Sequence, residues 1–359
     1  MRHPRRGRCP HEPHATFPMR LTVLLLVATI LTVALGCDKT KQREAERAFA
    51  DWIDKVNGRA AARKPPPPKL LDLAAKPPVL FQVFGEARDP RIVPIGVVEA
   101  GRVRPINLTR RGWQQFERVY TAPGTVLELY QDGRRTGTAR VVESMWQGRD
   151  SALYSLPGCR VALPVARVSL QGEVGGRQVV EALASNGKFG RPRDVEPMSP
   201  EEVRKVGREI ALLAGSRYGI SPRSLDSLDS RMIAVPTGTS KKPTIVIAYT
   251  NSAKRTVDTS ITRGPRQLLL LADVGEFGYH PTYRFYQTTT GFSPEFRRYI
   301  DHLDLDGDGA DELLVEASVV DVGTAYNVLE FSNDRWFERY RSDPNWCLDR
   351  RLVNDESAE

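Results

Sequence analysis

The chain has 359 residues, enough for two ordinary domains, and carries 52 Lys and Arg against 44 Asp and Glu, a formal net charge of +8 at pH 7. The basic residues are spread along the sequence, whereas nucleic-acid binding needs a basic surface gathered on one face. The composition therefore argues against a nucleic-acid partner.

The first 36 residues have the pattern of a secretory signal peptide. A basic flank ending at Arg20 precedes an apolar, uncharged run over 21–36. A membrane-spanning helix usually needs about 20 apolar residues, and this run is shorter. Met19 immediately precedes Arg20, so translation from either Met1 or Met19 would give a chain with the signal-peptide pattern. We predict that residues 1–36 are removed and contribute nothing to the fold.

The run ends in Val-Ala-Leu-Gly-Cys at 33–37. This sequence resembles the lipobox of bacterial lipoprotein precursors, although Ala34 and Leu35 reverse the commonest order. The resemblance implies that Cys37 receives a diacylglyceryl group, that the chain is cleaved before it, and that the new N-terminus is acylated. Two or more acyl chains hold a protein firmly on a membrane. The alternative is a simple N-terminal anchor with a cysteine at its edge.

Such a protein would lie in the bacterial cell envelope, lipid-anchored to a membrane, with its body outside the cytoplasm. Asp38 resembles the inner-membrane retention signal of enterobacterial lipoproteins, but this rule varies between bacteria, so inner and outer membrane both remain open. Residues 1–36 contain five Arg and one Glu, which leaves a net charge of +4 on the other 323 residues. That excess is too small to predict binding to anionic polymers.

Residues 37–76 are expected to form the lipid anchor and a tether. The apolar residues of 41–56 recur at the spacing of one helical face, which predicts an amphipathic helix. Four prolines at 65–68 predict an extended, semi-rigid spacer. The apolar face of the helix would dock on the body of the protein or contact a partner.

Residues 77–196 are expected to form a β domain. Asp132-Gly133 separates two strand-like runs and predicts a tight hairpin. The expected strands are 79–84, 92–98, 125–130, 136–142, 160–170 and 177–183. We predict a β-sandwich or a small barrel.

Residues 197–359 are expected to form an α+β domain, which makes the whole fold mainly β. Ser199 and Glu202 have the spacing of a capping box, with Pro200 at the first helical position. The predicted apolar face of this helix comprises Val203, Val206, Ile210 and Leu213. The antiparallel strands expected after it are 233–235, 244–249, 267–274, 283–289, 298–303, 312–319, 326–331 and 336–341.

Two cysteines other than Cys9 and Cys37 are present, Cys159 and Cys347. Outside the cytoplasm an even pair most simply predicts one disulfide. Two buried free thiols are the alternative.

The segment 304–312, Asp-Leu-Asp-Gly-Asp-Gly-Ala-Asp-Glu, carries the clearest indication of chemistry. Its alternating aspartates would point at one centre in a tight turn, for which Gly307 and Gly309 supply positive φ values. Calcium prefers about six to eight oxygen ligands at flexible geometry, and this loop offers them. The predicted ligands of one structural Ca²⁺ are Asp304, Asp306, Asp308, the carbonyl oxygen of Ala310, and Glu312.

An EF-hand needs a Glu at the twelfth loop position and flanking helices, whereas here that position is Val315 and the flanks are expected to be strands. The segment instead resembles the calcium loops of FG-GAP and related VCBS repeats, where a DxDxDGxxD/E stretch links two strands. FG-GAP propellers carry several copies and this chain has one, so the resemblance implies the loop and not a propeller. The alternative is a plain Asp-Gly-rich turn facing solvent.

These features favour a non-enzymatic, lipid-anchored envelope protein that binds or scaffolds an envelope protein or glycan. A rival hypothesis is an envelope metal-dependent hydrolase that uses acids near the loop. A third is a body without ligand that helps to assemble another membrane complex through the 41–56 helix. Asp301, His302 and Asp311 lie beside the loop, and as charged residues at strand ends we expect them to be solvated.

Overall fold

The first group of strands closes into a barrel. In the computed structural model, which describes residues 69–144, 165–173, 179–191, 193–251, 265–288, 295–319 and 323–342, these strands are all antiparallel to their neighbours. Around the barrel they follow the order β1, β7, β4, β5, β6, β2, and β2 pairs back to β1. The strands are β1 (Val79–Glu86), β2 (Asp89–Glu99), β4 (Val126–Gln131), β5 (Arg134–Ser144), β6 (Ala166–Gly172) and β7 (Val179–Ser185).

The barrel has an apolar interior because side chains alternate along each strand. On β1, Val79, Phe81 and Val83 point inward, whereas Leu80 belongs to a second core outside the barrel. The Asp132-Gly133 turn joins β4 to β5 with both residues at positive φ, as expected for this dipeptide. A short strand, β3 (Arg102–Arg104), pairs with the end of β2.

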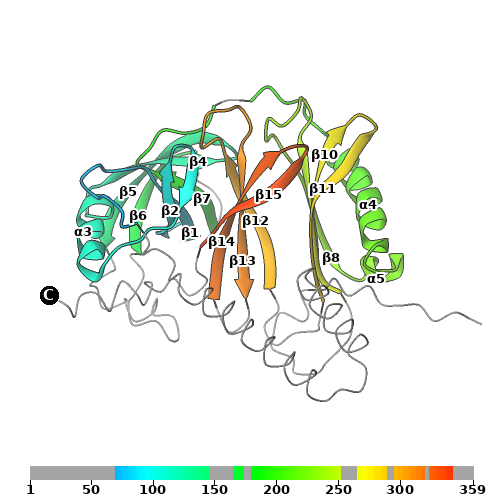
Figure 1. Cartoon of the computed structure of the whole chain (residues 1–359), viewed down its shortest axis with the longest axis horizontal. Helices are drawn as coiled ribbons and strands as arrows, with labels where there is room; N and C mark the ends of the chain where they lie inside the picture. Colours follow the sequence, from blue (N-terminus) through cyan, green and yellow to red (C-terminus); the bar gives the residue numbers. More distant parts are fainter. Residues whose placement is uncertain are drawn as a thin grey trace, which may run out of the picture. The chain divides into compact units, whose positions relative to one another are not determined.

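A helix that was not predicted, α3 (Arg110–Tyr120), contributes to the barrel core (Figure 1). The hydroxyl of Thr109 caps it by accepting the Gly112 N–H at 3.0 Å. Trp113, Phe116 and Tyr120 lie on one face of α3 and stack edge-on or tilted against one another.

The predicted capped helix is α4 (Pro200–Ser216), and its capping box is present. It covers one face of a sheet with the order β11-β10-β9-β8 (Figure 1). A short helix, α5 (Pro222–Asp226), follows α4. The strands of this sheet are β8 (Asp229–Val235), β9 (Thr244–Thr250), β10 (Pro265–Gly275) and β11 (Gly278–Thr288).

The predicted apolar face of α4 is wrong at Leu213, which is 59% exposed. The buried positions include small residues instead, among them Gly207, Ala211 and Ala214. A Cβ at Gly207 would lie 2.7 Å from the sulfur of Met232 on β8. The helix packs so close to the sheet that its small residues face inward, and this turns Leu213 toward solvent.

The last sheet is an antiparallel meander in the order β12-β13-β14-β15, and it is buried on both faces. One face packs against the outside of the barrel and the other against the sheet that α4 covers. Its strands are β12 (Glu295–Leu303), β13 (Glu312–Val319), β14 (Gly323–Ser332) and β15 (Arg335–Arg341). The prediction of a mainly β fold is confirmed, and the first β region is a barrel.

Several predicted features lie outside the described residues. They are Cys37, the 41–56 helix, the proline spacer at 65–68, Cys159 and Cys347. Within the described residues, no helix has the length and apolar character needed to cross a membrane.

Candidate metal centre

The loop between β12 and β13 brings three aspartates together. Asp304, Asp306 and Asp308 each offer one carboxylate oxygen, and these oxygens lie within 4.8 Å of one another. Asp304 is buried, whereas Asp306 and Asp308 are exposed. This group could hold a metal ion.

Each of these carboxylates also accepts a backbone hydrogen bond inside the loop. The N–H of Gly307 donates to Asp304 Oδ1 at 2.6 Å, that of Asp308 to Asp306 Oδ1 at 2.9 Å, and that of Ala310 to Asp308 Oδ1 at 2.7 Å. Such bonds also occur in a plain Asp-rich turn. They keep the loop tightly wound, and that winding places the three side chains around one centre.

Glu312 lies outside this group of three. Its Oε2 accepts the N–H of Leu305 at 2.8 Å, so the carboxylate reaches back across the loop from the first residue of β13. Burial, with a contribution from the charges of Asp306 and Asp304, raises the pKa of Glu312 to about 8. A cation in the loop would favour the ionised form of this side chain.

Segments from both other sheets approach the loop closely. A Cβ at Gly101, in the turn between β2 and β3, would overlap the Cβ of Asp306, and a Cβ at Gly238 would overlap the carbonyl oxygen of Gly309. Both glycines have positive φ. The N–H of Asp311 donates to the carbonyl of Thr237 at 2.7 Å, which fixes the segment after β8 to the start of β13.

Arg193 supplies the positive charge beside the loop. Its Nη2 lies 2.7 Å from Asp304 Oδ2 and 2.7 Å from Asp311 Oδ1, and its Nε lies 3.1 Å from Asp311 Oδ1. Both carboxylates are buried. Arg193 binds the outer oxygen of Asp304 and leaves Oδ1 on the side of the loop. No sequence pattern indicates this role, because Arg193 is more than a hundred residues from both partners.

The prediction that Asp301, His302 and Asp311 are solvated is wrong, because all three are buried. His302 Nδ1 lies 2.7 Å from the hydroxyl of Tyr299, and its Nε2 lies 3.6 Å from Asp311 Oδ2. Burial, with a contribution from the Arg193 charge, lowers the pKa of His302 to about 3. Burial also raises the pKa of Asp311 to about 6, although Arg193 opposes the shift.

The Asp132-Gly133 turn of the barrel shields these buried groups. The backbone N–H of Asp132 donates to Asp301 Oδ1 at 3.0 Å, and a Cβ at Gly133 would lie 2.7 Å from Asp311 Oδ2. The pKa of Asp301 is raised well above its usual range because the carboxyl is buried. Glycine is needed at position 133 both for its positive φ and for the close approach to His302 and Asp311.

The arrangement offers oxygen ligands to a metal ion and places other acids behind it. The buried and exposed carboxylates of the loop offer hard oxygen ligands, and the acids behind the loop lie too deep for a substrate to reach. Comparison with known proteins adds nothing to this geometry: no protein-family model matches the chain, and no match was found among curated proteins or solved structures.

Proposed function

We propose that the 304–312 loop binds one structural Ca²⁺ through Asp304, Asp306, Asp308, the carbonyl of Ala310 and Glu312. Hard carboxylate and carbonyl oxygens are the ligands that calcium prefers. The raised pKa of Glu312 supports its inclusion, because a cation would replace the proton that burial otherwise favours.

The observation that carries the proposal is the position of the loop. The Gly101 turn of the barrel contacts Asp306, and the segment after β8 contacts Gly309 and Asp311. An ion that rigidifies the loop would therefore strengthen the junction of the barrel with the other two sheets. This is the role of a structural metal, which contributes folding free energy and leaves no coordination position for a substrate.

The body so stabilised would be displayed on a bacterial envelope membrane by lipidated Cys37 and would bind or scaffold an envelope protein or glycan. The lipobox-like sequence at 33–37 supports the anchor. The buried state of Asp301, His302 and Asp311 supports a binding function over a hydrolytic one, because catalytic acids must reach the substrate.

Calcium titration of the full chain by calorimetry, with a melting curve alongside, tests the metal site. We expect one-site binding that raises the melting temperature and is lost in Asp306→Ala. Glu276→Ala removes the same charge from the exposed β10–β11 turn and should bind calcium like the wild type. Absence of binding to the wild type, or unchanged binding to Asp306→Ala, would refute the assignment.

The anchor is tested by growing a bacterial host that expresses the full chain with a palmitate analogue that can be tagged. We expect label in the wild type and in Cys159→Ser, and none in Cys37→Ser. An unlabelled wild type, or a labelled Cys37→Ser, would exclude lipidation at Cys37.

The raised pKa values of Asp311 and Glu312 are the observation that favours the rival, a metal-dependent hydrolase. This reading requires calcium- or magnesium-dependent turnover of a phosphate ester, peptide or glycoside that is lost in Glu312→Gln. Retention of calcium-dependent stability with no such turnover would favour the structural site.

A further inference from the structure

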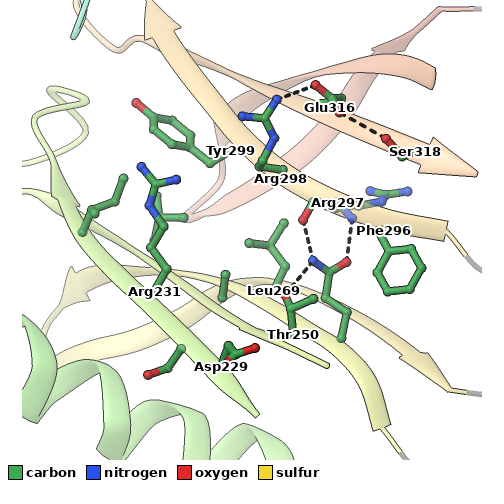
Figure 2. Close-up of a pocket in the computed structure, with 15 residues that line it drawn as sticks. Asp229, Arg231, Thr250, Leu269, Phe296, Arg297, Arg298, Tyr299, Glu316 and Ser318 are labelled. Carbon is green, nitrogen blue, oxygen red and sulfur yellow. Dashed lines mark hydrogen bonds and ion pairs between the residues drawn. The ribbon is translucent and has the colours of Figure 1, made fainter. Parts of the chain in front are cut away.

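A second site lies between the two stacked sheets, away from the metal loop. There a cavity of about 220 Å³ opens between β8, β9 and β10 on one side and β12 and β13 on the other (Figure 2). Apolar side chains form much of its surface: Ile233, Val246, Ala248, Leu269 and Phe296. Val246 and Leu269 of its wall also belong to the apolar core between the two sheets, so this opening is a local departure from close packing.

Paired hydrogen bonds join β10 to β12 on one side of the cavity. The side chain of Gln267 donates to the carbonyl of Arg297 at 2.6 Å and accepts the N–H of Arg297 at 2.6 Å (Figure 2). These paired bonds join the two sheets at the cavity wall. A preformed wall lowers the entropy cost of binding a ligand.

Two of the three arginines that line the cavity are already neutralised. Arg297 pairs with Glu295 at 2.6 Å and with Glu338 at 2.9 Å. Arg298 pairs with Glu316 at 2.6 Å and also with Glu181 of the barrel. Neither guanidinium is available to a further anion without losing one of these partners.

Arg231 differs from both. It is exposed on β8, and no Asp or Glu carboxylate of the described chain lies within 4.0 Å of its guanidinium. Asp229 also lines the cavity, but no ion pair joins it to Arg231. Figure 2 shows the Arg231 side chain extending from β8 toward Tyr299 of β12. An arginine is always charged and presents a planar set of donors that matches a carboxylate.

We propose that this cavity binds a small carboxylic acid with an apolar body, whose carboxylate pairs with Arg231 and whose body packs on Val246, Leu269 and Phe296. The volume of the cavity limits the size of the ligand. An apolar cavity of about 150 Å³ holds a benzene molecule, and sites for drug-sized ligands usually start near 300 Å³. A body of one aromatic ring or one branched chain fits between these limits. This site does not depend on calcium binding.

The test uses the full chain with 3-phenylpropionate as probe and 3-phenylpropionamide as its uncharged analogue, measured by saturation-transfer NMR and calorimetry. We expect the acid to bind at millimolar concentration or below and the amide to bind about tenfold more weakly. Arg231→Met should abolish the preference for the acid, and Arg231→Lys should retain part of it. Arg335→Met, at an exposed position at the start of β15, is the matched control and should bind like the wild type.

A substitution that fills the cavity tests the site independently of Arg231. Ala248→Phe should reduce binding of both probes at least about tenfold while its melting curve shows a folded protein. Equal binding of acid and amide, or unchanged binding in Arg231→Met, would overturn the role of Arg231. No binding of either probe up to about 10 mM would overturn the site itself.

Discussion

The barrel interior and the 304–312 junction are stabilised by different physical means. The barrel core consists of apolar side chains, and its sheet closes on itself, so its backbone groups are paired. The junction buries Asp301, Asp304, Asp311 and Glu312, and Arg193 pairs with two of them, Asp304 and Asp311. Apolar side chains neither take up protons nor bind cations, whereas buried carboxylates do both. The junction is therefore where the protein should sense cations and acidity.

The largest effect should come from emptying the barrel core. Phe116→Ala removes a fully buried ring that contacts Phe81, Trp113 and Tyr120, and should lower the free energy of unfolding by about 3–5 kcal/mol. Urea unfolding measures this loss of stability. Calcium affinity should not change, because Phe116 lies in the barrel core whereas Leu305 of the loop packs in the second core outside the barrel; a clear drop in affinity would show that the two regions are coupled.

Removing the junction's positive charge should have a similar cost. Arg193→Ala leaves Asp304 and Asp311 buried and unpaired, which should destabilise the chelator-treated protein by about 3–5 kcal/mol. Calcium should recover part of this loss, and its affinity should rise because a nearby cation is gone. Arg191→Ala removes the same charge from an exposed neighbour and should match the wild type. Equal melting temperatures for both variants would contradict the role of Arg193.

The contact between the barrel and the loop should give an intermediate effect. Gly101→Ala introduces backbone strain at φ +74° and a Cβ that overlaps Asp306, so it should destabilise the protein by about 1–3 kcal/mol and weaken calcium binding. Gly124→Ala, at φ +90° with open space around it, introduces strain alone. Calorimetry should find weakened calcium binding only in Gly101→Ala, and equal affinities would mean that this contact does not shape the loop.

The smallest effect should be a change in how the stability of the protein depends on pH. Burial raises the pKa of Asp301, so the folded chain keeps a proton that the unfolded chain releases above pH about 4. The stability of the calcium-free protein should therefore fall as pH rises through this window. Asp301→Asn cannot titrate and should be more stable than the wild type by about 1 kcal/mol at pH 5. Asp334→Asn, in the exposed β14–β15 turn, should show the same dependence of unfolding free energy on pH as the wild type. If Asp301→Asn also showed the wild-type dependence, this effect would be excluded.

Features encoded by neighbouring residues were predictable from the sequence. The three aspartates of the loop converge because their spacing and the glycines between them are local, and the predicted 312–319 strand matches β13. Helix α3 was missed although Trp113, Phe116 and Tyr120 recur at the spacing of one helical face, so the signal was present in the sequence. The partners of the loop were also missed. Gly101 is indistinguishable from any turn glycine, and Arg193 finds Asp304 and Asp311 only through the tertiary fold.

The burial of the β12–β15 sheet on both faces has a consequence for how the protein forms. The hydroxyl of Tyr326 on β14 donates to Gln82 of β1, and that of Tyr340 on β15 donates to the carbonyl of Ile95 on β2, across sequence separations of 244 and 245 residues. Contacts of such long range slow folding, because loop-closure entropy is lost before they form. The outer apolar faces of the strands synthesised first therefore stay uncovered until the last strands are synthesised. During that time these faces can cause aggregation. A chaperone that holds the nascent chain unfolded until its C-terminal strands emerge should increase the yield of folded protein.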